Sequence, residues 1–384
     1  MHSLRRISPN DGRHYFFGYY DIPAFDPSGR FHLCHRVGFR DRLPAPADTA
    51  ELGVFDLATG GFEIFGETQA WNFQQGSMLQ WLGHDGDLIA YNDFNGADGF
   101  HSVIYSFVED RIISRLCLPF ASLSSDDRFA LSINFSRMYD FRPGYGYCNL
   151  PDKWRDEKQP TDDGIYLVDL KNNSTRLILS LANIASAIKE FAPVADEKLL
   201  VNHITFNLGG TRFLALVRNF PVAISGGKDG TWNTTVITAN RDGTDLHVLP
   251  TKAYASHYHW KNQATFAIHS DGPAKHQLYE ITDTENASLS AIDRTFFIKD
   301  GHCSYSPDRS RMLYDSYPDE SRLQHLYIYD LAARQGREIA AFHSPPVHPI
   351  DIRCDLHPRW GPDGKCVSFD STHEGFRGLY LMQL

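Results

Sequence analysis

The chain alternates short polar turns with short apolar stretches along its whole length. Seven turns rich in Asp, Gly, Ser, Pro or Asn each precede an apolar stretch, at residues 25–30, 83–86, 124–127, 207–211, 261–263, 306–309 and 361–364. Stretches with period-two alternation follow, for example at residues 165–170, 326–331 and 378–382. This period is typical of β-strands, and the turn composition is typical of the connections between them.

The spacing of the turns predicts the architecture. They recur at intervals of roughly 40 to 60 residues, which fits one four-stranded propeller blade. Radial repetition also protects the sheet edges without covering helices. A helix is expected only at residues 184–191. We therefore predict an all-β fold, a seven-bladed β-propeller, as a single domain over residues 1–384; a pair of two-sheet sandwiches is the alternative and explains the regular repeat less well.

The third interval is the longest because it holds two insertions, the expected helix at residues 184–191 and a loop at about residues 140–163. Within this loop, residues 142–147 combine two tyrosines and two glycines with a proline, which stiffens the backbone. A long loop inside a compact domain is usually functional or disordered, and this composition argues against disorder. We expect the insertion to lie over one mouth of the propeller.

Composition and charge narrow the classes of partner. The 384 residues are 42% hydrophobic and 22% charged, as in ordinary folded proteins, and the formal charge of -10 argues against a nucleic-acid partner. No apolar run approaches the ~20 residues that span a bilayer, so no membrane partner is expected. Residues 1–10 lack the apolar core of a secretory signal, and the six cysteines do not form a disulfide framework. A cytoplasmic location is the expectation.

Histidines and cysteines precede three of the later turns. In a propeller, equivalent positions of successive blades lie side by side around the axis, so these side chains are expected to meet at a metal. Imidazole with thiolate suits Zn²⁺, whereas imidazole with oxygen ligands also admits Mn²⁺. A structural zinc is favoured, with manganese or calcium as alternatives. The candidate ligands are His257 or His259, His302 or Cys303, Cys354 and His357.

A second set of candidates surrounds the insertion and fits the chemistry of uronates. Removing the proton next to a uronate carboxylate requires a base, a cation or amide that neutralises the carboxylate, and an acid for the leaving oxygen. Tyr and His can act as base and acid, and Arg can bind a carboxylate through two hydrogen bonds. The candidates are Tyr139, Arg142, Tyr145, Tyr147 and Arg155 in and beside the insertion, His203 after it, and the residues 71–76 and 91–93 before it.

Other motifs carry less chemistry. His32, His35, His84 and His101 are more typical of structural strand or turn histidines. The Gly-x-Ser-x-Gly motif of serine hydrolases is absent from the sequence. The glycine-rich residues 224–230 lack the spacing of a phosphate-binding loop, so a nucleotide enzyme is not expected.

These features together resemble the propellers of oligogalacturonate lyase and of the propeller-type ulvan lyases. The resemblance covers nearly the whole chain and rests on the Ser-Pro-Asp-type turns preceded by histidine, and on residues 354–360. Residues 17–21, 71–76, 142–147 and 202–203 are most similar to the ulvan lyases. The resemblance implies seven blades, a bound metal and β-elimination next to a uronate. In oligogalacturonate lyase the metal engages the substrate carboxylate, whereas in the ulvan lyases a zinc is structural.

Carried over to this chain, the resemblance assigns the catalytic acid/base to Tyr139 and the carboxylate-neutralising cation to Arg155, with His203 lining the same cleft. The ulvan lyases have histidines in the preceding blade where this chain has Gln74, Gln75, Asn92 and Asp93. Without them, Tyr139 is expected to serve as base and acid together, and an inactive or differently specific relative stays open. The expected substrate-binding residues are Arg142, Tyr147, Gln75 and Asn92.

The expected function is that of a polysaccharide lyase, an enzyme that cleaves an anionic ulvan-like or oligouronide substrate by β-elimination. The alternative from another class is a non-catalytic propeller that binds a glycan or protein partner in polysaccharide metabolism. A glycoside hydrolase would require paired carboxylates, for which Asp93, Asp140 and Asp163 are weak candidates.

Overall fold

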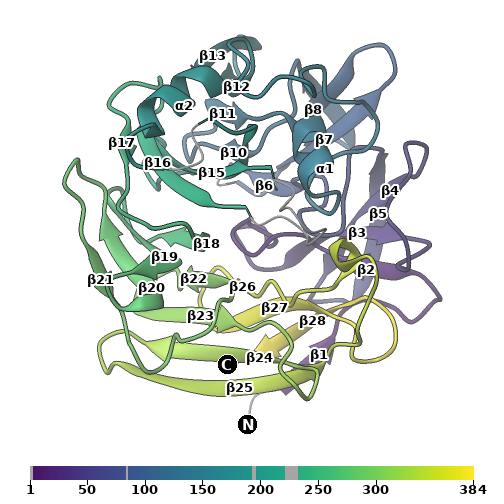
Figure 1. Ribbon diagram of the computed structural model, residues 1–384. Coiled ribbons are helices and arrows are strands. Elements are labelled where there is room, and N and C mark those ends of the chain that lie inside the picture. The colour runs from purple at the N-terminus through teal and green to yellow at the C-terminus, as the bar shows by residue number, and fades with distance from the viewer. Residues whose placement is uncertain (1–2, 84, 193–195, 221–231) are drawn as a thin grey trace. The chain divides into compact units, whose positions relative to one another are not determined.

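The computed structural model describes residues 3–83, 85–192, 196–220 and 232–384. Its strands form seven four-stranded antiparallel sheets, which confirms the predicted seven-bladed β-propeller (Figure 1). His84 and the glycine-rich residues 224–230 lie outside the described residues.

The strands follow one another in chain order within nearly every sheet. The first two sheets contain β2 (His14–Phe16), β3 (Phe31–Val37), β4 (Ala50–Asp56) and β5 (Gly61–Thr68), then β6 (Gln80–Leu82), β7 (Leu88–Asn95), β8 (Gly99–Ser106) and β9 (Arg111–Leu116). The next two contain β10 (Ser122–Leu123), β11 (Phe129–Ser132), β12 (Gly164–Asp169) and β13 (Ser174–Ser180), then β14 (Leu199–Phe206), β15 (Arg212–Asn219), β16 (Thr234–Asn240) and β17 (His247–Val248). The fifth and sixth contain β18 (Ala255–Trp260), β19 (Thr265–Gly272), β20 (Lys275–Thr282) and β21 (Leu289–Ala291), then β22 (Cys303–Tyr305), β23 (Arg311–Asp315), β24 (Leu323–Asp330) and β25 (Gln335–His343).

The last sheet joins the two ends of the described chain. It contains β26 (Arg359–Trp360), β27 (Cys366–Ser371) and β28 (Gly378–Gln383), with the N-terminal β1 (Ser3–Arg6) as its fourth strand. In the register, Leu4 pairs with Met382. Every predicted turn lies between the first and second strands of a sheet, which is why the turns mark the repeat so regularly.

Helices are short and few in the described residues. The helix expected at residues 184–191 is α2 (Leu181–Ile188), which starts earlier because Ser180 caps it and forms a reciprocal capping box with Asn183. A second helix, α1 (Phe135–Phe141), was not predicted; η1 (Ile350–Ile352) is a single 3₁₀ turn. None of these helices has the length and hydropathy needed to span a membrane.

The chain divides into two compact units. Unit 1 comprises Met1–Pro119, Arg142–Leu150 and Gly301–Leu384, and unit 2 comprises Phe120–Phe141 and Pro151–Asp300. Residues 142–163, all of them described, form no helix or strand, as expected for the insertion. The first part of this insertion belongs to unit 1 and the rest to unit 2. The single domain over residues 1–384 stays a prediction.

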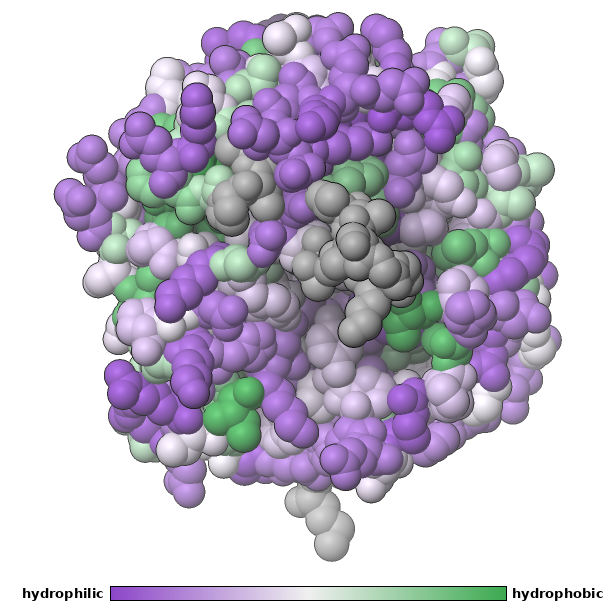
Figure 2. All heavy atoms as spheres, viewed as in Figure 1, coloured by the Kyte–Doolittle hydropathy of each residue, from purple (hydrophilic) through white to green (hydrophobic). Residues whose placement is uncertain are grey.

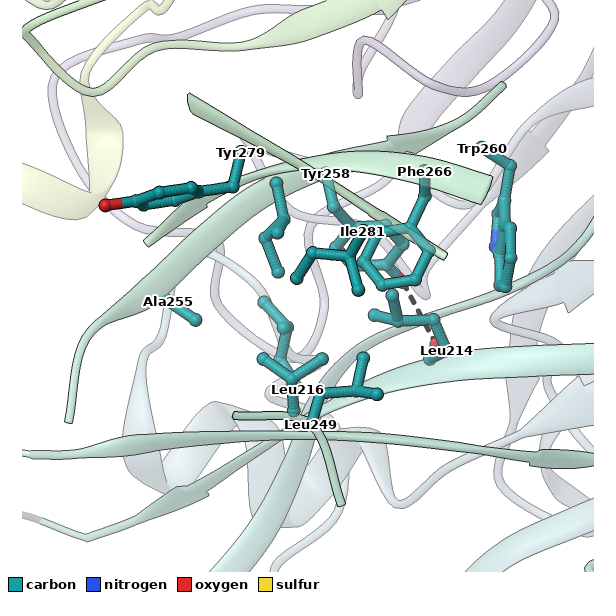
Figure 3. Close-up of a cluster of buried hydrophobic side chains, with 11 residues drawn as sticks. Leu214, Leu216, Leu249, Ala255, Tyr258, Trp260, Phe266, Tyr279 and Ile281 are labelled. Atoms are coloured by element: carbon teal, nitrogen blue, oxygen red, sulfur yellow. Dashed lines mark hydrogen bonds between the residues drawn. The ribbon is translucent and has the colours of Figure 1, made fainter. Parts of the chain in front are cut away.

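Side chains from neighbouring sheets interlock in the core of unit 2 (Figure 3). Leu214 and Leu216 of β15 pack with Tyr258 of β18 and Phe266 of β19, and each is at most 2% exposed. The Tyr258 hydroxyl donates a 3.1 Å hydrogen bond to the Leu214 carbonyl oxygen, so the buried phenol keeps a polar partner. Burial of each such side chain contributes about 1.5–3 kcal/mol to folding. By contrast, Figure 2 shows mostly hydrophilic residues on the face in view.

We predict that Leu216→Ala lowers the free energy of unfolding by roughly 2–5 kcal/mol, because it leaves a cavity between packed sheets. The matched control is Leu208→Ala, which removes the same atoms from a side chain that is 41% exposed and is expected to cost less than about 0.5 kcal/mol. Urea denaturation followed by tryptophan fluorescence measures both values. Equal losses for the two variants would contradict the assigned core.

Candidate functional site

Among the described residues, one group of His, Cys, Asp and Glu side chains has the geometry of a metal site. It consists of His302, Asp355 and His357, whose ligand atoms all lie within 4.8 Å of one another. All three side chains are buried and belong to unit 1. His302 immediately precedes β22, and the other two lie in the loop between η1 and β26. Two of the four predicted metal ligands therefore come together, with an aspartate that the prediction did not select.

The imidazole of His302 is oriented by Asp315 at the end of β23. Its Nδ1 lies 2.9 and 3.0 Å from the two Asp315 carboxylate oxygens, and its backbone N–H donates to the same carboxylate at 2.7 Å. An Nδ1–H that donates to a carboxylate leaves the lone pair on Nε2, which is the arrangement found in metal-binding histidines. Gly301 permits this close approach, since a Cβ there would lie 1.9 Å from the Asp315 carbonyl oxygen.

The imidazole of His357 has the same tautomer for a different reason. Its Nδ1 lies 2.9 Å from the carbonyl oxygen of Gly18, which can only accept a hydrogen bond. Gly18 has φ +138°, and a Cβ on it would lie 2.9 Å from the Gln75 carbonyl oxygen, so glycine is required. His357 itself has φ +42°, a left-handed conformation that costs about 1–2 kcal/mol in a non-glycine residue. Such strain is concentrated at functional sites.

Asp355 is held by the buried Arg353. Arg353 Nε donates to Asp355 Oδ1 at 3.1 Å, and its Nη2 lies 2.8 Å from Oδ2. The same Nη2 donates to the Tyr145 hydroxyl at 2.8 Å. Burial by itself lowers the pKa of the Arg353 guanidinium, but the Asp355 carboxylate and the Tyr145 phenol outweigh it and hold that pKa well above its usual value. Arg353 therefore stays charged and holds the Asp355 carboxylate in place.

Aromatic rings surround the two imidazoles. The rings of His302 and His357 lie 4.3 Å apart between centroids, nearly perpendicular to each other. Tyr20 packs against His302 at 5.1 Å and Tyr19 against His357 at 4.9 Å. These contacts fix the ring planes and exclude water, and a low local dielectric strengthens the interactions of any ion held there.

The donor set fits a divalent transition metal. Two imidazoles and one carboxylate form the two-histidine, one-carboxylate set, which binds Mn²⁺, Fe²⁺ and Zn²⁺ and leaves coordination positions open. Cys354 is outside the group: its Sγ lies 3.8 Å from the Asp355 carbonyl oxygen, and burial raises the pKa of the thiol to about 12. The thiolate on which the preference for zinc rested is thus not among these ligands.

His257, the remaining predicted ligand, lies in unit 2 on β18. Its Nδ1 is 3.1 Å from Asp300 Oδ1, and Tyr254 donates to the other carboxylate oxygen at 2.6 Å. Although burial raises the pKa of the Asp300 carboxyl, the His257 imidazole and the hydrogen bonds hold it well below its usual value. An imidazole oriented in this way can act as a metal ligand or as a proton acceptor through Nε2.

The three predicted catalytic residues also lie in unit 2. Tyr139 is half-buried on α1, and Arg155 is exposed in a turn of the insertion. His203 is 6% exposed on β14, where its ring lies 4.5 Å from that of Tyr258. Their assignment to catalysis stays a prediction.

A further cation in unit 2, Arg218, was not selected from the sequence. It is 7% exposed on β15 and donates to Asn202 Oδ1 at 2.8 Å and to Thr234 Oγ1 at 3.1 Å. An arginine inside an otherwise apolar strand is the signal that would have found it, because a buried charge requires a specific reason.

The four predicted substrate-binding residues lie in unit 1. Asn92 Nδ2 donates to the Tyr147 hydroxyl at 3.0 Å, and both side chains are fully buried, so this pair anchors the insertion. Burial raises the pKa of the Tyr147 phenol. The Arg142 guanidinium lies 4.5 Å above the Tyr145 ring, and Gln75 is buried with its backbone N–H bonded to an asparagine side chain.

Comparison with known proteins shows the fold and leaves the family open. No protein-family model matches the chain, and no curated protein matches it by sequence. An oligogalacturonate lyase solved in complex with manganese superposes with a TM-score of 0.68 at 16% identity, covering 99% of this chain and 93% of that one. The oligogalacturonate lyase of Vibrio parahaemolyticus gives a TM-score of 0.66 at 12% identity with the same coverage. The propeller domain of the Trilobed protease from Pyrococcus furiosus gives 0.50 at 11% identity, covering 95% of each chain.

We predict that Asp355→Asn and His302→Ala each weaken Mn²⁺ or Zn²⁺ binding by at least about 100-fold, and that Asp315→Asn weakens it about 10- to 100-fold by releasing the His302 ring. Isothermal titration of metal-stripped protein gives these affinities. His325→Ala, which also removes a carboxylate-bonded imidazole from unit 1, is the control and is expected to bind normally.

Cys354→Ser decides the role of the thiol in the same titration. The geometry leads us to expect an affinity within about threefold of the unaltered protein, since a thiol outside the ligand group contributes no metal bond. A loss as large as that of Asp355→Asn would instead support the predicted thiolate ligand.

Proposed function

We propose that this protein is a metal-dependent lyase that cleaves a uronate-containing oligo- or polysaccharide by β-elimination. The observation that carries the proposal is the buried group of His302, Asp355 and His357 with its orienting partners. Support comes from the fold, which is shared over nearly the whole chain with an oligogalacturonate lyase solved in complex with manganese.

The chemistry of a uronate explains why such a group is useful. The proton next to the carboxylate is removed more easily when the negative charge of the carboxylate is neutralised. A divalent cation held by His302, Asp355 and His357 would supply that neutralisation through its open coordination positions. Arg353 supports the cation by holding the Asp355 carboxylate in place.

The proposal favours manganese over zinc. The oxygen donor of Asp355 and the absence of a thiolate from the group, as far as the described residues go, suit Mn²⁺. Zinc is compatible with the same three donors, as in hydrolytic zinc sites with two histidines and one carboxylate. The expected calcium alternative is less favoured, because imidazole is a poor ligand for a cation that prefers oxygen.

The proton acceptor is assigned by chemistry to a histidine. Two histidines of unit 2 are candidates: His203, which the sequence analysis predicted, and His257, whose imidazolium would be stabilised by Asp300. The earlier candidates Tyr139, Arg155 and His203 stay predictions, and the variant His203→Ala described below tests the last of them.

The substrate class follows from the proposed charge neutralisation. An anionic oligouronide of the galacturonate type is the first choice, and ulvan-like polymers are the second, because Gln75 and Asn92 stand where the resemblance expects histidines. A cytoplasmic location stays a prediction.

We predict that the manganese-loaded protein produces the ultraviolet absorbance of a 4,5-unsaturated uronate from at least one member of a panel of oligogalacturonates, other oligouronides and ulvan. Removal of the metal with a chelator is expected to abolish it, and Mn²⁺ to restore it. If no member of the panel is cleaved but calorimetry detects binding of one of them, the non-catalytic binding propeller is favoured instead.

A comparison of His257→Ala with His203→Ala identifies the acceptor. We expect the variant that removes the acceptor to lower kcat by about 10²–10⁴-fold while metal affinity is unchanged, because general-base catalysis contributes about that factor. A loss of metal together with activity would show His257 to be a ligand, as the sequence analysis predicted. If only His203→Ala is inactive, the base is His203.

A further inference from the structure

We propose that Tyr145 is the catalytic acid that protonates the leaving oxygen. This inference rests on the proposed lyase function and adds a residue to it. Tyr145 lies in the first part of the insertion. It belongs to the same unit as His302, Asp355 and His357, which together are called the metal group. The Tyr145 hydroxyl accepts a 2.8 Å hydrogen bond from Arg353 Nη2. The same nitrogen lies 2.8 Å from Oδ2 of the proposed ligand Asp355.

The position of the phenol follows from the rings around it. The Tyr145 ring lies 6.3 Å from that of Tyr19, which itself packs against His357 at 4.9 Å. Tyr145 is 3% exposed, close to the 2% of His302 and His357, so the phenol and the two imidazoles are enclosed to the same degree. A uronate whose carboxylate is held at this group has its C4 oxygen two carbons away, within the reach of a neighbouring phenol.

The hydrogen-bond pattern leaves the phenol proton for donation. Arg353 Nη2 can only donate, so the Tyr145 oxygen accepts that bond and its own proton is not used in it. Once the proton has left, the phenolate faces the Arg353 guanidinium, whose Nη2 lies 2.8 Å from the phenol oxygen and also contacts Asp355. The Arg142 guanidinium, 4.5 Å above the same ring, adds a second positive charge. Both positive charges lie where they would attract the negative charge of that phenolate.

The step balances without any further reactant. The base takes the proton from C5, and the electrons of that C–H bond form the C4=C5 double bond. The bond between C4 and the glycosidic oxygen breaks, and its electron pair stays on that oxygen. The oxygen takes the proton of Tyr145, which leaves a phenolate beside Arg353, and water later returns a proton to the phenolate.

Tyr147, the neighbouring phenol, lacks these features. Its oxygen accepts from the neutral amide of Asn92, and burial raises the pKa of the phenol. Only Tyr145 of the two is bonded to a cation that also contacts a member of the metal group. The sequence analysis placed both tyrosines in one candidate set, and the charge of the hydrogen-bond donor separates them.

The test uses leaving groups of different basicity with the variant Tyr145→Phe. With a glycosidic substrate, whose leaving alkoxide needs a proton, we expect kcat to fall about 10²–10⁴-fold. With a 4-O-aryl uronate, whose phenoxide leaves without protonation, we expect a fall of less than about tenfold. Mn²⁺ affinity, measured by titration, is expected to stay within about threefold, which separates loss of the acid from loss of the site.

Tyr15→Phe is the matched control, since it also removes a buried hydroxyl bonded to a charged side chain of unit 1, Asp11. It is expected to leave both substrates and the metal affinity unchanged. If Tyr145→Phe slows the two substrates equally, or slows neither, Tyr145 is not the acid. If the unaltered protein cleaves neither substrate, the proposed function itself fails.

A second substitution covers the case in which Tyr145→Phe does not fold. Replacing Tyr145 by 3-fluorotyrosine keeps the ring and hydroxyl and lowers the pKa of the phenol. We expect the alkaline limb of the kcat/KM profile to move to lower pH, because that limb reports the ionisation of the essential acid. An unmoved limb would overturn the proposal.

Discussion

A hydrogen bond from an imidazole Nδ1 to a buried oxygen is the interaction on which the candidate site depends. It occurs at His302 with Asp315 and at His357 with the Gly18 carbonyl. In unit 2, the same kind of bond joins His257 to Asp300. In each case it orients the ring and places the lone pair on Nε2. These three histidines, which come from different sheets or loops, therefore share one tautomer. It has the proton on Nδ1 and the lone pair on Nε2, whichever of them bind a metal or take a proton.

Burial makes the charges near the site dependent on one another. Arg353 stays ionised because Asp355 and Tyr145 are in contact with it, and Asp355 keeps its place because of Arg353. Removal of one partner of such a pair leaves an uncompensated charge, which is strongly destabilising. The insertion takes part through Tyr145, so a segment that forms no regular structure is held by the electrostatics of the site.

The repeat pattern predicted the fold because it depends on local chemistry. A turn of Asp, Gly, Ser or Pro before each second strand is a preference of a few residues, and it recurs in every sheet. The two elements that the repeat pattern did not predict, β1 and α1, were also missed for local reasons. Strand β1 is largely exposed and carries little apolar signal, and α1 has only seven residues, too few to show a helical period.

The sequence by itself determined the propeller and its turns, and it singled out His302 and His357, two members of the group that could hold a metal. Only the tertiary structure decided that Asp355, and neither Cys354 nor Cys303, completes that group among the described residues. The reason is conformational: the left-handed backbone at His357 and the pairing of Asp355 with Arg353 determine which side chains of one short loop converge. Spacing along a chain does not encode those directions, because they depend on partners that are far away in sequence.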